Sequence, residues 1–167
     1  EKVCRNVINI KGIVMPLTQK ISVTPVQADD REQWQRLYYD YADFYQVPMN
    51  QVILDTVWSW ILDDSQAFYA LIAKDHAGNA VGLMHYRAML SPLRGAAVGF
   101  LDDLYVDPAV RGEGVVDQLF AGLSAAAKKQ GWPLVRWITA ENNYRARSVY
   151  DKLATKTHWQ TYQLTIE

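Results

Sequence analysis

The sequence predicts a single α/β domain (α+β by some schemes), in which a mixed central sheet is flanked by helices. Segments that alternate between apolar and polar residues, as strands do, are interspersed with segments whose apolar residues recur at helical spacing. The chain has 167 residues, enough for one domain that buries about 70% of its unfolded surface. One strand-like segment, Phe100 to Val106, leads through a glycine-rich turn directly into a helix-like segment.

The predicted elements follow the order β-α-α-β-β-β-α-β-α-β. They are a strand at 21–26, a helix capped by Asp29 or Asp30 and running to about Tyr45, a helix capped by Asn50 and ending near 63–64, strands at 67–73, 80–90 and 100–106, a helix from 115 to about 130, a strand at 134–139, a helix from 143 to about 154, and a strand at 159–166.

Helix and strand ends are set by residues with defined backbone preferences. Pro48 ends the first helix because proline lacks the N–H that the helix needs. Asn50 is a typical N-cap for the second helix. Residues 75–79 form the turn of a hairpin, 91–97 a loop, and 131–133, Gly-Trp-Pro, a helix stop.

The first fourteen residues are expected to be a vector-derived or disordered leader, with the domain spanning 15–167. The chain does not begin with methionine, and Met15 could be a native start. The alternative is a genuine additional strand through Val7 to Ile10.

Composition excludes several classes of function. The formal net charge is −1 without a long basic run, so nucleic acid is not an expected partner. The sequence contains no run of about 18 apolar residues, so no membrane span is expected. Cys4 is the single cysteine, which excludes an intrachain disulfide and fits a cytoplasmic protein. The three histidines have no metal-ligand spacing, so no metal is expected.

The turn at Arg111-Gly112-Glu113-Gly114 predicts an anion site. Free backbone N–H groups and the dipole of the following helix both favour negative charge there. The turn lacks the lysine of a Walker loop and the third glycine of a dinucleotide loop.

The stretch from Leu101 to Val116 resembles the acyl-CoA site of the GNAT superfamily of N-acetyltransferases. That family has a strand of the type hydrophobic-[DE]-D-hydrophobic-aromatic-Val, here LDDLYV, followed by Q/R-x-x-G-x-G/A, here RGEGVV. Val116 departs from the pattern, where the family has a small residue. The resemblance implies an acetyl-CoA site formed by Leu104, Tyr105, Val106, Arg111, Gly112, Glu113, Gly114, Val115, Val116, Asn143 and Tyr150.

Within that resemblance, the backbone of Leu104 and Val106 is expected to pair with the pantetheine arm, and an N–H near Leu104 to serve as oxyanion donor. Glu113 and Asp117 would repel phosphate, and Arg111 would offset this in part.

A second motif, N-x-x-A-x-x-x-Y, stands at Asn143 to Tyr150. The two end residues are seven apart, two turns along one helix face. In the family the tyrosine points at the CoA sulfur, which implies that Tyr150 protonates the leaving thiolate as a general acid. The alternative is a core aromatic. The distance from Tyr150 to the last predicted strand resembles the histone/polyamine branch of the family.

Transfer to an amine also requires a base. Resemblance to polyamine acetyltransferases assigns that role to Asp102, directly or through a water. Asp102 and Asp103 are expected on opposite faces because side chains alternate along a strand. Glu141 is the second candidate, and a purely structural or cation-attracting role for Asp102 is the alternative.

The acceptor side is expected to involve aromatic residues of the first two helices, since aromatic faces suit a cationic amine. Tyr38, Tyr41, Tyr45 and Trp58 fit this, although such spacing equally describes a core. His85 is either a substrate contact or a satisfied core histidine. Arg145 and Arg147 either reach CoA phosphates or are solvated.

The predicted function is direct transfer of acetyl from acetyl-CoA to a primary amine in a ternary complex. The amine could belong to a polyamine, an amino acid or a protein lysine. The alternative is a non-catalytic acyl-CoA-binding module of the same fold. A homodimer is implied only by the resemblance.

Overall fold

The computed structural model describes residues 7–10, 13–16 and 21–166. The chain forms two compact units, Glu1–Trp137 and Ile138–Glu167. In the first, β1 (Val7–Ile10) pairs antiparallel with β2 (Ile13–Pro16). The strand given above as the alternative for this stretch corresponds to β1. Cys4 lies outside the described residues.

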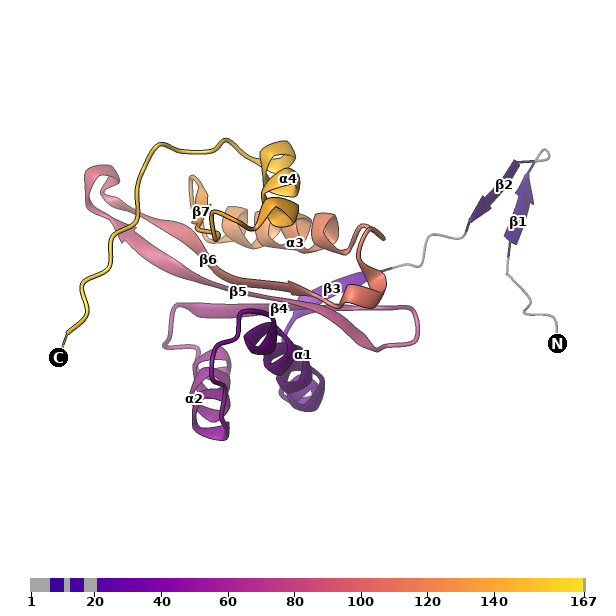
Figure 1. Cartoon of the computed structure of the whole chain (residues 1–167), viewed down its shortest axis with the longest axis horizontal. Helices are drawn as coiled ribbons and strands as arrows, with labels where there is room; N and C mark the ends of the chain where they lie inside the picture. Colours follow the sequence, from indigo (N-terminus) through magenta and orange to yellow (C-terminus); the bar gives the residue numbers. More distant parts are fainter. Residues whose placement is uncertain (1–6, 11–12, 17–20, 167) are drawn as a thin grey trace. The chain divides into compact units, whose positions relative to one another are not determined.

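The first unit is built on a mixed five-stranded sheet in the order β3-β4-β5-β6-β7 (Figure 1). Its strands are β3 (Ser22–Pro25), β4 (Phe68–Lys74), β5 (Ala80–Ser91), β6 (Ala96–Val106) and β7 (Val135–Trp137). Neighbouring strands are antiparallel except β6 and β7, which are parallel. The predicted mixed sheet is confirmed.

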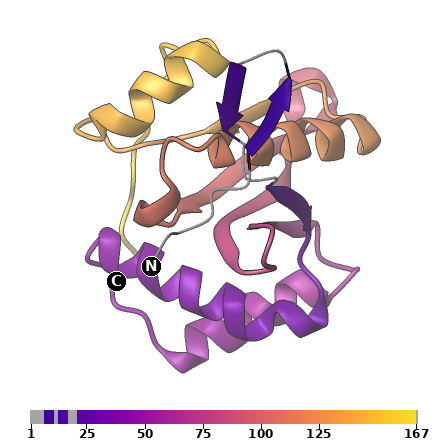
Figure 2. The same ribbon diagram turned by 90° about the vertical axis from the view of Figure 1, so that its right-hand side faces the viewer.

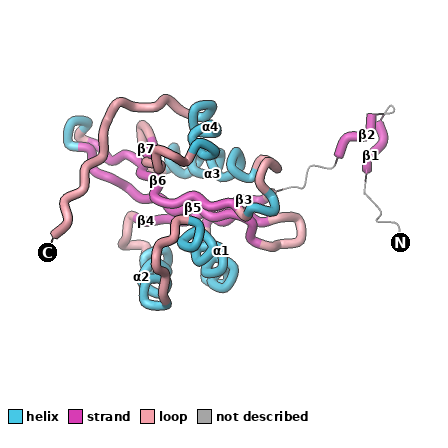
Figure 3. The backbone as a smooth tube through the Cα atoms, in the orientation of Figure 1, coloured by secondary structure: helices cyan, strands magenta, loops and turns pink. Residues whose placement is uncertain are grey.

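Helices cover both faces of this sheet. α1 (Arg31–Phe44) and α2 (Gln51–Leu62) lie on one face and α3 (Val115–Lys129) lies on the other, as Figures 1 and 3 show. Figure 2 gives the same layers after a 90° turn. Each face of the sheet carries a hydrophobic core. Because side chains alternate along β4, Leu71 packs in the core on the α3 side and Ile72 packs in the core on the α1/α2 side.

The predicted caps are confirmed at α2 and differ at α1. Asn50 Oδ1 accepts a hydrogen bond from the Ile53 N–H at 3.0 Å. Asp30, at the start of α1, makes no side-chain cap. Its buried carboxylate instead accepts from the Gln27 N–H at 2.9 Å and pairs with Lys74. This carboxylate therefore joins α1 to β4.

One hairpin and the last predicted strand differ from expectation. The β5–β6 hairpin extends further, because a short 3-10 turn at Pro92–Arg94 and Gly95 at φ 60° connect Ser91 directly to Ala96. In the second unit, α4 (Tyr144–Leu153) forms as predicted, but the strand predicted at 159–166 is wrong. Alternating apolar and polar residues allow a segment to form a strand, but a strand also needs a neighbouring strand with which to pair. Tyr162 and Leu164 are accordingly 91% and 84% exposed.

Candidate active site

The central feature of the site is a β-bulge in β6. His85 of β5 pairs with Asp103, but the next residue, Tyr86, pairs with Leu101. Asp102 is therefore the extra residue that a bulge inserts into one strand. The bulge breaks the side-chain alternation on which the sequence prediction relied.

Both carboxylates consequently lie on the α1/α2 face of the sheet. Asp103 contacts His85 and Asp102 contacts Arg87, and these two partners are two residues apart on β5, hence on one face. The expectation that the two aspartates lie on opposite faces is wrong. A single face therefore carries two adjacent carboxylates.

Asp102 forms an ion pair with Arg87. The guanidinium Nε donates to Asp102 Oδ1 at 3.1 Å and to Oδ2 at 3.0 Å, and its carbon lies 4.9 Å from the centroid of the Phe100 ring. Burial raises the pKa of the Asp102 carboxyl above its ordinary value, although Arg87 acts in the opposite direction. Asp102 is thus the carboxylate that binds a proton more readily.

Asp103 is held by three side chains. Its Oδ2 lies 2.9 Å from His85 Nδ1, and the hydroxyls of Tyr38 and Tyr41 hydrogen-bond to it. Burial by itself raises the pKa of this carboxyl, but its interactions with His85, followed by the hydrogen bonds from Tyr41 and Tyr38, outweigh burial, so the net pKa lies below the ordinary value. Asp103 therefore stays ionised under conditions where Asp102 begins to protonate.

The aromatic residues of α1 line this face in a continuous row. Trp34 is fully buried, and its ring centroid lies 5.3 Å from that of Tyr38, which stacks at 6.1 Å on Tyr41. Tyr41 contacts Tyr45 at 5.0 Å. Burial raises the pKa of both Tyr38 and Tyr41, and the charge of Asp103 raises it further, so both are protonated donors.

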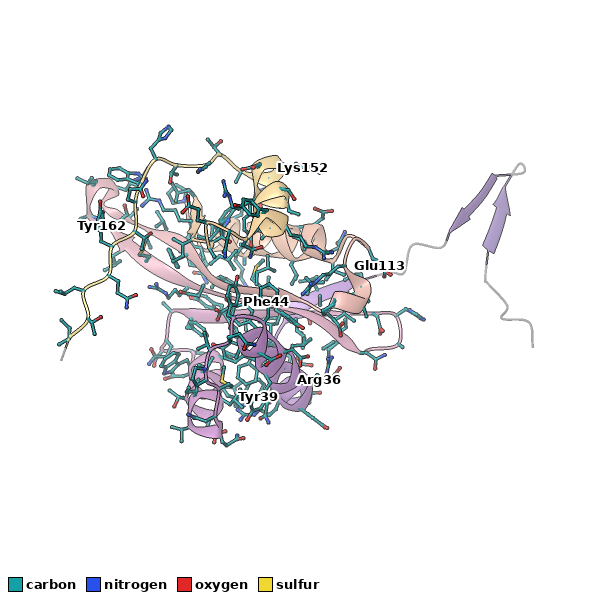
Figure 4. The ribbon with its side chains drawn as sticks, viewed as in Figure 1. Arg36, Tyr39, Phe44, Glu113, Lys152 and Tyr162 are labelled. Atoms are coloured by element: carbon teal, nitrogen blue, oxygen red, sulfur yellow. The ribbon has the colours of Figure 1, made fainter. Side chains whose placement is uncertain are left out.

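The row ends in exposed rings at the C-terminus of α1. Tyr45 is 40% exposed and Phe44, labelled in Figure 4, is 55% exposed. Trp58 of α2 packs against Trp34 at 5.0 Å. Of the four aromatics predicted for the acceptor side, Tyr38, Tyr41 and Trp58 all pack against the α1/α2 core, and Tyr38 and Tyr41 also contact Asp103.

Beyond the bulge, β6 has an open edge. β6 pairs with β7 only from Gly99 to Leu101. The Asp107 N–H donates to the Val81 carbonyl, so these two residues form a hydrogen-bonded pair of the β5–β6 ladder. Hydrogen-bonded and non-hydrogen-bonded pairs alternate along an antiparallel ladder. Leu104 and Val106 therefore belong to non-hydrogen-bonded pairs, and their backbone groups point away from β5. The Val106 carbonyl accepts from Arg111 Nε at 3.1 Å. Tyr105 faces the opposite way from these two and packs in the α1/α2 core.

The predicted glycine-rich turn at 111–114 has a left-handed backbone at both glycines. Gly112 and Gly114 have φ of 91° and 81°, a region that favours glycine. Apart from the chain neighbours of each glycine, no atom of the described residues lies within 4 Å of the position of a Cβ at either residue. Gly114 leads into α3 at Val115, whose first-turn N–H groups have no partner within the helix. The turn is therefore open for close approach of an anion.

Four side chains around the turn bear on how well an anion would fit there. Val116 packs against the α3-side core and so leaves the turn unobstructed. Glu113 is exposed, as Figure 4 shows, and Asp117 is exposed in the first turn of α3. The Arg111 guanidinium carbon lies 5.8 Å from the centroid of Phe44, which links the turn to the end of α1.

The second motif lies in the second unit. Asn143 caps α4, because its Oδ1 accepts from the Ala146 N–H at 3.2 Å. Tyr150 is half-buried two turns further along the helix. Arg147 donates to the Glu141 carbonyl at 2.6 Å, and Glu141 itself is exposed in the turn before α4.

Sequence reasoning missed the partners that organise the two carboxylates. Arg87 and Trp34 were not predicted as site residues, and His85 was left between two roles. The structure makes His85 a satisfied core histidine, fully buried between Trp34 and Asp103. The strand register places Arg87 and His85 beside the two aspartates, and the packing of α1 on the sheet places Trp34 beside His85; a single sequence reveals neither.

The described residues contain no group of three or more His, Cys, Asp or Glu side chains that could hold a metal ion. In the same part of the chain, every helix is too short or too polar to cross a membrane.

The sequence matches the acetyltransferase (GNAT) family over residues 33–154. It is 29% identical over 148 residues to the D-amino-acid N-acetyltransferase HPA3 of Saccharomyces cerevisiae, a match that covers 88% of this chain and 92% of that protein.

Solved structures share the fold. A ribosomal-protein-alanine N-acetyltransferase from Brucella melitensis biovar Abortus 2308 superposes with a TM-score of 0.75 at 23% identity, over 88% of this chain and 100% of that one. AAC(6')-Iy in complex with a bisubstrate analogue, CoA-S-monomethyl-acetylneamine, superposes with a TM-score of 0.77 at 18% identity, over 89% and 99%.

Proposed function

The chain belongs to the acetyltransferase (GNAT) family and is an acyltransferase, and from this premise we propose that it transfers acetyl from acetyl-CoA to a primary amine of a small molecule. The observation that carries the proposal is the bulge in β6. It places two carboxylates on an aromatic-lined face and coincides with the point where β6 leaves β7. An amine site and an open backbone edge therefore lie on one strand.

The glycine turn and the open edge fit acetyl-CoA. Gly112 and Gly114 leave space for a pyrophosphate beside the N-terminus of α3, where backbone N–H groups and the helix dipole favour an anion. The outward backbone groups of Leu104 and Val106 are suited to hydrogen-bond the amide groups of pantetheine. The Leu104 N–H is our candidate for the oxyanion donor.

The amine must lose a proton before it attacks. An alkyl ammonium has a pKa near 10.4, so neutralising it at pH 7 costs about 4.6 kcal/mol. Asp102 is the candidate base, directly or through a water. Burial raises its pKa toward the range in which a carboxylate accepts protons effectively. Glu141 remains the second candidate.

The reaction then proceeds in balanced steps within one ternary complex. The ammonium gives a proton to the base, and its nitrogen forms a bond to the thioester carbonyl carbon. The tetrahedral intermediate collapses with cleavage of the C–S bond. The electron pair leaves on sulfur, and the nitrogen gives its second proton to solvent. Tyr150, as general acid, gives the thiolate a proton and regains one from solvent. The products are an N-acetylated amine, free CoA and one proton.

The acceptor class is proposed from the relatives and the site together. The yeast relative is named for D-amino acids, and AAC(6')-Iy was solved with an analogue that contains an acetylated neamine. Amino acids are therefore the first acceptors to test, followed by polyamines, aminoglycosides and a lysine peptide. The non-catalytic alternative is not retained, because the chain is an acyltransferase.

The proposal is tested by thiol release from acetyl-CoA, measured with a thiol reagent against this amine panel. Amine-dependent release is expected, with a drop of at least tenfold in the Tyr150→Phe variant. Parallel initial-velocity lines, or loss of activity in Cys4→Ala, would indicate a covalent acyl-enzyme and contradict direct transfer. Absence of release with every amine would overturn the proposal.

A further inference from the structure

Three side chains from different elements form a hydrogen-bonded chain that ends at Asp103. Trp34 Nε1 lies 2.8 Å from His85 Nε2, and His85 Nδ1 lies 2.9 Å from Asp103 Oδ2. The indole N–H can only donate, so His85 Nε2 must be an acceptor. The imidazole proton is therefore on Nδ1, which donates to the carboxylate.

This arrangement keeps His85 neutral. A second proton on Nε2 would point at the N–H of Trp34, and the fully buried ring has no solvent to which it could turn. The ring is also packed between aromatic neighbours, with centroid distances of 4.7 Å to Tyr38 and 5.6 Å to Phe68. His85 thus acts as a fixed, uncharged donor.

The charges on this face then leave Asp103 uncompensated. Arg87 neutralises Asp102, His85 is neutral, and Tyr38 and Tyr41 are uncharged donors to Asp103. The side chain of Asp103 remains 19% exposed. A single net negative charge therefore sits at Asp103, at the inner end of the aromatic row.

We propose that Asp103 docks the ammonium group of the acceptor, and that His85 and Trp34 are positioning residues that orient Asp103 and preserve its charge. The inference rests on the proposed function and deepens it, because it separates docking at Asp103 from proton removal at Asp102. It also defines the acceptor as a cation that enters along the aromatic face of α1.

Two substitutions at one position separate this role from simple core packing. His85→Asn places an amide N–H where Nδ1 lies and so keeps the donor to Asp103. His85→Gln places its amide at the Nε2 position and loses that donor. The amine KM is expected to rise at least tenfold in His85→Gln and about threefold or less in His85→Asn, with the KM for acetyl-CoA unchanged in both.

Leu83→Ala supplies the packing control, because Leu83 is fully buried on the same face of β5. It should lower stability without a selective change in the amine KM. Equal amine KM values in the two His85 variants, or a matching increase in Leu83→Ala, would overturn the positioning role.

A nitrogen NMR experiment tests the inference without turnover. In the wild-type protein the His85 ring should show a proton on Nδ1 alone, whereas Trp34→Phe should free Nε2 from its indole donor. Titration with the best acceptor, or with 1-butylamine if none is turned over, should shift the Nδ1–H resonance in the wild type and not in Asp103→Asn.

The two proposals fail separately. A protein that binds 1-butylamine in this way but acetylates no amine would refute the proposed function and leave Asp103 as the docking group. A protonated Nε2 in the wild type, or an amine-induced shift that persists in Asp103→Asn, would overturn the inference even if acetylation is fast.

Discussion

Asp102 and Asp103 are neighbours with opposite electrostatic behaviour. Burial is the first influence on both carboxyl groups and raises the pKa of each, but the partners differ. Arg87 offsets burial at Asp102 only in part. His85 and two tyrosines more than offset it at Asp103. Environments that separate the pKa values of two adjacent acids are a recurrent way to divide roles between them.

The Arg87→Ala variant tests this division through the pH dependence of kcat/KM. Arg87 lowers the pKa of Asp102, so its removal should raise that pKa further and move the acid limb of the profile to higher pH. Ionisation of the amine itself cancels when both enzymes are assayed with the same acceptor. Arg87→Lys, which keeps the charge, should show a smaller displacement. An acid limb that stays in place or moves to lower pH would exclude Asp102 as the titrating base.

At the scale of the element, the glycine turn is a backbone device that sequence could identify. Positive φ at Gly112 and Gly114 was implied by the glycines, and the N-terminus of α3 was implied by the apolar periodicity that starts at Val115. These are local properties, so a single sequence carries them. The same holds for the Asn50 cap and for the start of α4 near Asn143.

The Gly114→Trp variant should abolish measurable binding of CoA in calorimetry, because the indole would occupy the open space beside the turn. Gly78→Trp is a matched control. Gly78 has φ 86° and equally open surroundings, but it lies in the β4–β5 hairpin turn. Both variants carry a similar backbone cost of about 1–2 kcal/mol. Equal CoA affinity in the two variants would remove the turn from the binding site.

The bulge in β6 is the element that sequence did not reveal. It depends on which residue of β5 lies opposite each residue of β6, and this pairing is set by tertiary packing. The sequence therefore indicated both aspartates and the wrong face for one of them. The last strand was wrong for a related reason, since Trp159 and the residues after it have strand character but no ladder among the described strands.

The junction of β6 with β7 depends on close packing at Gly99. A Cβ at this position would lie 2.7 Å from Trp132 Cε3 and 2.9 Å from Val135 Cγ2. Gly99→Ala should therefore destabilise the protein by roughly 1–3 kcal/mol through overpacking, measured by urea unfolding. Trp132→Leu, which removes the ring from this contact, should reduce the penalty in a double-mutant cycle. An additive double variant would show that the ring does not cause the strain.

At the scale of the whole molecule, the site and the core share residues. Asp103 connects β6 to β5 through His85 and to α1 through Tyr38 and Tyr41, while Trp34 belongs to the buried cluster beneath them. Polar networks inside a core stabilise a fold only when every member has a partner. No buried side-chain polar atom among the described residues is left without one. Substitutions in the network are therefore expected to affect stability as well as activity.

The Asp103→Asn variant should make that shared dependence visible as a change in the pH dependence of unfolding. Because the pKa of Asp103 is lower in the folded protein than in the unfolded chain, its charge contributes stability above the unfolded pKa, and this contribution disappears as the pH falls through the folded pKa. At neutral pH the variant should lose roughly 1.5–3 kcal/mol in the free energy of unfolding, the usual contribution of a hydrogen bond to a charged group. As the pH falls through the lowered pKa of Asp103, the difference from the wild type should shrink, since the wild-type carboxyl then loses its charge too. Asp64→Asn, at an exposed position outside the network, controls for the general effect of removing a carboxylate. A penalty that is independent of pH would mean that Asp103 acts through its shape and not through its charge, and it would weaken the case that the same charge docks the acceptor.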